Sequence, residues 1–114
     1  MKNLITIALL SIALAGSAFA QTAAQKRQYA KDTCNTAVTF AGKMKPVMEE
    51  MVAKIPNLPT DQQAEADRAV TVFIHDVSRT VDDSCVANPI PLVIAQDMAR
   101  MGEDMHTAFV ATGI

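Results

Sequence analysis

Residues 60–85, TDQQAEADRAVTVFIHDVSRTVDDSC, form the longest amphipathic segment of this chain that no proline interrupts, and the remaining segments are expected to pack against it. Apolar residues recur in it at steps of three and four, the spacing of one face of an α-helix, and polar residues fall between them. The stretch therefore predicts a long amphipathic helix. Its expected core face comprises Ala66, Val70, Phe73, Val77, Val81 and Cys85.

Three helices are predicted, over residues 22–55, 60–87 and 91–111, because proline-containing segments at 56–59 and 88–91 interrupt the helical pattern. Thr60 is expected to cap the second helix in a capping box with Gln63, and Gly113 to end the third. Pro46 lies inside the first helix and predicts either a kink or a break there. No strand pattern occurs. The predicted fold class is all-α: a small up-down bundle of three helices, or of four if Pro46 breaks the first.

The flanking helices also carry apolar stripes at helical spacing. The expected core face of the first helix is Ala30, Cys34, Ala37, Ala41, Met44, Met48, Met51 and Ile55, and that of the third is Ile94, Met98, Met101, Met105 and Phe109. Gln96, Asp97, Arg100, Glu103 and Asp104 are expected on the solvent side of the third helix.

Cys34 and Cys85 are the two cysteines of the chain, and each lies on an apolar stripe. At 1.5 Å per residue, Cys34 lies ~32 Å and Cys85 ~38 Å from the turn between their helices, so an antiparallel hairpin places them at similar heights. A disulfide needs Cα atoms within about 7 Å, which a small adjustment at Pro46 would supply. We therefore expect a Cys34–Cys85 disulfide. A redox or metal-binding pair is less favoured because neither cysteine belongs to a C-x-x-C motif.

Residues 1–20 have the pattern of a secretory signal peptide: a cation at Lys2, an apolar run from 4 to 14, and Ala18 and Ala20 before the expected cleavage site. We expect a periplasmic or secreted protein in which residues 21–114 form a single helical domain. No apolar run reaches the ~20 residues that a membrane-spanning helix needs. Residues 21–114 carry a net charge of −3, with +3 in 21–55 and −6 in 56–114, which argues against general nucleic-acid binding.

The sequence contains no motif of an established catalytic mechanism, such as H-E-x-x-H, G-x-S-x-G or a phosphate-binding loop, so an enzyme is not expected. His75 and Asp76 are adjacent on a helix and point about 100° apart, so they are not expected to form a catalytic pair. Asp76, Arg79 and Asp83 have the spacing of ion pairs on a solvated helix face.

Methionine is the most informative residue type for function, because six occur in residues 21–114 in two clusters. Methionine side chains form adaptable apolar surfaces, so the first hypothesis is a protein that binds another protein of the cell envelope or an unfolded chain, as a chaperone, adaptor, inhibitor or immunity protein. Thioethers also bind Cu(I), so the alternative is a copper-binding or copper-tolerance protein; otherwise no cofactor is expected. The clusters are Met44, Met48 and Met51, and Met98, Met101 and Met105, with His106 added as a ligand in the copper hypothesis.

Overall fold

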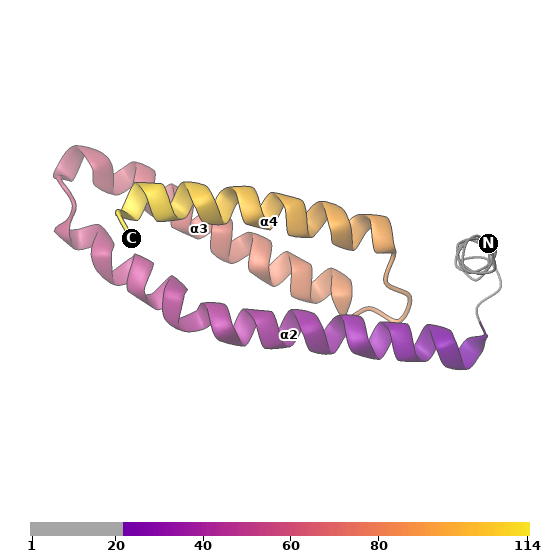
Figure 1. Cartoon of the computed structure of the whole chain (residues 1–114). Helices are drawn as coiled ribbons and strands as arrows, with labels where there is room; N and C mark the ends of the chain where they lie inside the picture. Colours follow the sequence, from indigo (N-terminus) through magenta and orange to yellow (C-terminus); the bar gives the residue numbers. More distant parts are fainter. Residues whose placement is uncertain (1–21) are drawn as a thin grey trace, which may run out of the picture.

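The computed structural model describes residues 22–114, and the predicted signal peptide lies outside the described residues. Three α-helices, α2 (Ala23–Lys54), α3 (Thr60–Ser84) and α4 (Pro91–Thr112), are joined by a short 3-10 helix, η1 (Ile55–Asn57), and a loop. The helices run alongside one another and the chain reverses at each connection (Figure 1). No strand occurs between residues 22 and 114, so the prediction of an all-α helical bundle is confirmed. None of these helices has a stretch long and apolar enough to cross a bilayer.

α2 is one continuous helix that contains Pro46, so the proline does not break it. The helix is visibly bent along its length in Figure 1. A proline inside a helix removes one hydrogen bond and presses on the preceding turn, which bends the helix. Of the two predicted outcomes, a kinked helix and a split helix, the structure shows the unbroken one.

The predicted disulfide joins Cys34 of α2 to Cys85, and the two Cα atoms are 4.4 Å apart. Cys85 follows the last residue of α3, which ends at Ser84, three residues before the predicted end. Because the chain leaves the helix there, Cys85 is exposed, whereas the sequence pattern placed it on the core face. The disulfide thus fastens the end of α3 to the side of α2.

The core is built around α3, with α2 on one side of it and α4 on the other (Figure 1). Phe73, Val70 and Met51 are almost completely buried. The predicted apolar stripes of α2 and α3 supply most of this core, but Met98 of α4 is 56% exposed and lies outside it. The buried apolar cluster is Met51, Val70, Phe73, Val77, Met101 and Ala108.

The buried face of α3 is wider than the single apolar stripe predicted. Asp76 and Thr80 of α3 and Asp97 of α4 are each 5% exposed, although the sequence pattern assigned both aspartates to solvated faces. A helix that packs against two neighbours must bury more of its circumference than one stripe, and here the additional buried residues are polar. The Thr80 hydroxyl donates a hydrogen bond to the backbone carbonyl oxygen of Asp76 at 2.8 Å, so it is not left unpaired.

The predicted capping box at Thr60 is wrong. Thr60 is already the first helical residue, Pro59 occupies the N-cap position, and no side chain caps the helix. Gln63 instead donates through Nε2 to the carbonyl oxygens of Leu58 at 3.0 Å and of Pro56 at 3.3 Å. A capping box does form at the start of α2, between Thr22 and Gln25. Gly113 ends α4 with φ 72°, as predicted.

This geometry predicts different costs for two neighbouring substitutions. Gln63→Ala removes a partly buried hydrogen bond and should lower the free energy of unfolding by about 1 kcal/mol. Thr60→Ala should change it by less than about 0.5 kcal/mol, because the Thr60 hydroxyl caps nothing. Urea unfolding of both variants checks the pair. A larger loss of unfolding free energy for Thr60→Ala than for Gln63→Ala would indicate that Thr60 does cap α3.

Candidate functional site

An apolar groove runs between the N-terminal half of α2 and the first half of α4, with α3 as its floor. Its volume is about 530 Å³. Small side chains explain why it is open, because Thr33, Ala37 and Ala95 are too short to fill the space between the two helices. The lining residues are Tyr29, Asp32, Thr33, Thr36, Ala37 and Phe40 of α2, Thr80 and Ser84 of α3, and Pro91, Ile94, Ala95, Met98 and Met101 of α4.

The groove exists because α4 packs mainly on α3 and contacts α2 only slightly. The disulfide holds α2 against the end of α3, so α2 and α4 flank the same stretch of α3 without closing on each other. The hollow therefore follows from the backbone arrangement as well as from the small side chains. A site of this kind exists before any ligand arrives.

The lining is almost uncharged. Asp32 is the charged side chain among the described lining residues, and its Oδ1 accepts a hydrogen bond from Gln28 Nε2 at 2.8 Å. Phe40, Ile94 and Met98 provide larger apolar surfaces on the two walls. Such a groove favours an apolar occupant, because water released from these surfaces provides the free energy of binding.

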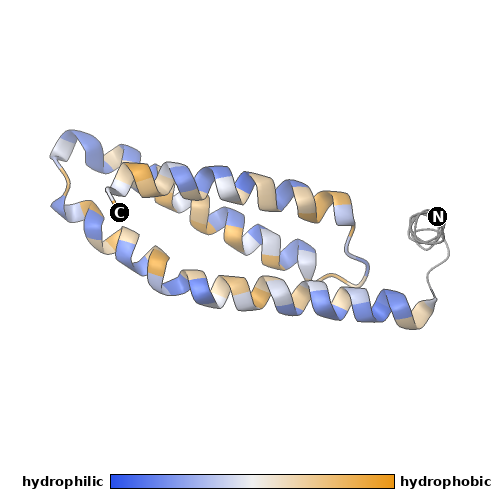
Figure 2. Ribbon diagram, viewed as in Figure 1, coloured by the Kyte–Doolittle hydropathy of each residue, from blue (hydrophilic) through white to orange (hydrophobic). Residues whose placement is uncertain are grey.

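Apolar residues are also exposed beside the groove, around the start of α4. Ile90 is 60% exposed and Leu92 66% exposed, and Met98 lies two turns further along the helix. Figure 2 shows hydrophobic residues at this end of α4. Contiguous exposed apolar surface commonly marks a binding site for a protein or another apolar partner.

The structure divides the predicted methionine sites between the core and the groove. Met51 is completely buried, and Met44 and Met48 pack against the core beside it. Met105 also packs against the core. Met101 is 7% exposed and forms part of both the core and the groove wall, whereas Met98 lies open in the groove.

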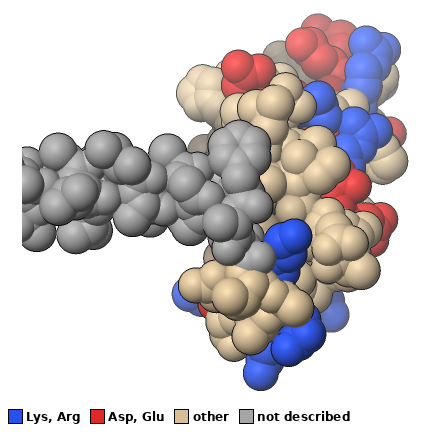
Figure 3. Space-filling model, turned by 90° about the vertical axis from the view of Figure 1, so that its right-hand side faces the viewer, with Lys and Arg blue, Asp and Glu red and all other residues tan. Residues whose placement is uncertain are grey.

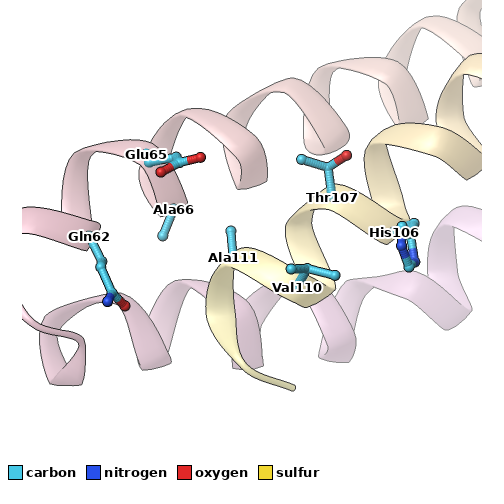
Figure 4. Close-up of a pocket in the computed structure, with 7 residues that line it drawn as sticks. All are labelled: Gln62, Glu65, Ala66, His106, Thr107, Val110 and Ala111. Carbon is cyan, nitrogen blue, oxygen red and sulfur yellow. The ribbon is translucent and has the colours of Figure 1, made fainter.

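His106, a ligand in the copper hypothesis, lines a different hollow between the N-terminal part of α3 and the C-terminal part of α4, of about 470 Å³. Figure 4 shows this hollow, with Glu65 and His106 at opposite ends of it. The two side chains do not point toward each other, so they do not resemble a base with an orienting carboxylate. His106 thus lines a hollow that contains no methionine, whereas Met98 and Met101 line the groove, and Cu(I) binding stays a prediction.

Asp76, buried between α3 and α4, has an unusual protonation equilibrium. Burial, hydrogen bonding with Asp104 and the negative charge of Asp104 together raise its pKa from 3.8 to about 6. Arg100 and Arg79 act in the opposite direction and offset only part of this effect. Asp76 Oδ2 is buried without a hydrogen-bond partner.

Asp97 of α4 is the counterpart of Asp76. Burial raises its pKa, and so do hydrogen bonding with Asp83 and the charge of Asp83, while Arg100 and Arg79 lower it. Its Oδ1 lies 3.7 Å from Arg100 Nη1, and its Oδ2 is buried without a partner. Two carboxyl pairs therefore bridge α3 and α4.

The charge asymmetry of the sequence is visible on the surface. In Figure 3, the charged side chains at the foot of the view, where α2 lies, are mostly Lys and Arg, whereas Asp and Glu side chains lie beside further Lys and Arg in its upper part.

The groove and the carboxyl pairs were both missed by pattern reading. The small residues Thr33, Thr36 and Ala37 on one side of α2 were the signal for the groove, since small residues at a helix contact leave space when no large partner faces them. The signal for the carboxyl pairs was a spacing of Asp, Arg and Asp that occurs in both α3 and α4. Comparison of the chain with protein-family models, curated proteins and solved structures gave no match.

Proposed function

We propose that the protein is a non-enzymatic binding protein of the cell envelope that holds an apolar segment of another chain in the groove between α2 and α4. The observation that carries the proposal is the open, nearly uncharged groove with Met98 exposed on its wall. The flexible methionine side chain adapts to apolar partners of different shape. This favours a chaperone or adaptor that accepts many segments over a partner with one rigid binding surface.

The location in the envelope rests on two supports. Residues 1–20 have the signal-peptide pattern, and a disulfide of the kind found here persists in oxidising compartments. The proposed clients are therefore exported proteins that are unfolded or partly folded. The fold we propose for the mature protein is a three-helix up-down bundle, since α2 is unbroken.

Blocking the groove should abolish this function while leaving the fold intact. Ala95→Trp fills the space from an exposed position, and Met98→Glu places a charge on the wall. Each should weaken binding of an unfolded client by about tenfold or more, because apolar anchors in grooves carry most of the binding energy. The measurement is the affinity for reduced, iodoacetamide-alkylated lysozyme, by fluorescence anisotropy with the disulfide of this protein intact.

Val72→Glu is the matched control, because Val72 is 41% exposed on α3 and does not line the groove. It introduces the same charge into an exposed apolar position and should leave the affinity unchanged. Equal affinity for the wild type, Ala95→Trp and Met98→Glu would contradict the groove as the binding site. Failure of the wild type to bind the client or to suppress its aggregation would contradict the proposed function.

A further inference from the structure

The residues of the polar contact between α3 and α4 have the same sequence spacing in both helices. α3 carries Asp76, Arg79 and Asp83, and α4 carries Asp97, Arg100 and Asp104, each with the pattern D-x-x-R-x-x-x-D. The helices are antiparallel, so the first aspartate of each pattern meets the last aspartate of the other. We call these six residues the carboxyl interface.

The carboxyl interface contains more acid than base. Four carboxyls and two guanidiniums leave two negative charges uncompensated when every group is ionised, and Arg100 is itself 47% exposed to water. Asp76 and Asp97 are each 5% exposed and keep one oxygen without a partner. Facing carboxylates at a buried contact repel each other, and the repulsion is poorly screened.

One proton in each pair removes this excess. A protonated carboxyl donates its O–H to the facing carboxylate, so each proton replaces a repulsion by a hydrogen bond. With two protons bound, the net charge of the carboxyl interface is zero. No charged group of α2 acts on Asp76 or Asp97, and the groups that do are Arg79, Asp83, Arg100 and Asp104.

We propose that the carboxyl interface is a pH-sensitive contact that binds protons to hold α4 against α3 in mildly acidic solution and loosens in neutral solution.

The direction in which stability changes with pH follows from the direction of the pKa shifts. The folded protein holds the Asp76 proton more tightly than the unfolded chain, since the pKa is about 6 in the fold and 3.8 as the ordinary value. The stabilisation is complete below the ordinary value and is lost as the pH rises through the folded value. Between pH 5 and pH 7, Asp76 alone changes the folding equilibrium constant by about tenfold. Asp97 acts in the same direction.

α4 is the helix that such a contact would release. The disulfide fastens α2 to the end of α3, whereas α4 is held by its packing on α3. Because α4 forms one wall of the groove, pH would also change the shape of the groove. This last consequence, unlike the pH-dependent contact itself, rests on the proposed function.

The test is chemical unfolding of the oxidised protein between pH 5 and pH 8, compared with the double variant Asp76→Asn, Asp97→Asn. Asparagine resembles a protonated carboxyl in shape and in its ability to donate. The wild type should lose at least tenfold in its folding equilibrium constant between pH 5 and pH 7, and the variant should lose much less. At pH 7.5 the variant should be the more stable protein. Hydrogen exchange should show α4 less protected at pH 7.5 than at pH 5.5 in the wild type alone.

The double variant Asp67→Asn, Glu103→Gln removes one exposed carboxylate from each of α3 and α4 and is the matched control. It should keep the pH dependence of the wild type. A wild-type profile that is flat between pH 5 and pH 7, or an equally steep profile in Asp76→Asn, Asp97→Asn, would overturn the proposal. None of these measurements uses a client, so the groove can fail as a binding site without affecting the result.

Discussion

Replacing both Cys34 and Cys85 by alanine should lower the free energy of unfolding by about 4 kcal/mol. The disulfide links residues 51 positions apart, and closing a loop of this size removes conformational entropy from the unfolded chain. A small domain has only about 5–15 kcal/mol of stability in total, so the variant should be partly unfolded at moderate temperature. Urea unfolding of the oxidised wild type and the variant measures the difference.

The loss of stability on removal of the disulfide should also be localised to one part of the structure. The N-terminal half of α2 forms one wall of an open groove, and the disulfide at Cys34 is its covalent link to the end of α3. Hydrogen exchange after reduction should show the loss of protection beginning there. The reduced wild type is the matched control, because it has the same side chains without the bond. A difference below about 1 kcal/mol between oxidised and reduced protein would show that packing alone holds α2.

Phe73→Ala should cost about 3–5 kcal/mol, the range found when a large aromatic side chain is removed from a core. Phe73 is completely buried in the middle of α3, in the cluster that joins Met51 of α2 to Met101 of α4. Its removal leaves a cavity at the point where all three helices meet. Urea unfolding of the wild type and the variant at the same pH measures the cost, because the carboxyl interface then contributes equally to both.

Val72→Ala is the control for Phe73→Ala, because Val72 is the adjacent residue and is 41% exposed. It should cost less than about 0.5 kcal/mol. Phe73→Leu should fall between the two, since it keeps most of the apolar volume. A cost for Phe73→Ala similar to that of Val72→Ala would mean that α3 does not hold the core together.

The backbone of this fold could be predicted from local chemistry. The proline pairs at 56–59 and 89–91 separate the helices, Gly113 ends the last one, and helix arithmetic brought Cys34 and Cys85 together. The error at Thr60 had a local cause: the helix begins one residue earlier than a capping threonine requires, so Gln63 bonds to the preceding turn.

The candidate site could not be predicted in the same way, because it depends on which helices become neighbours. A hydrophobic stripe identifies one core face, and α3 has two neighbours, so Asp76 was assigned to solvent although α4 covers it. The groove requires the relative placement of α2 and α4, which no residue pattern along one helix contains. Met98 was also misplaced by its pattern: its spacing matches the core stripe of α4, but the side chain is exposed in the structure.

Binding of apolar segments of other chains in the groove between α2 and α4 can be tested by a methyl NMR titration. The oxidised protein, labelled at methionine and alanine methyl groups, is titrated with reduced and iodoacetamide-alkylated lysozyme. If the groove binds the client, the methyl resonances of Ala37, Ala95 and Met98 should shift, while that of Ala64, exposed on α3 away from the groove, stays in place. Shifts at Ala64 without shifts at the groove methyls, or no shifts at saturating client, would contradict it.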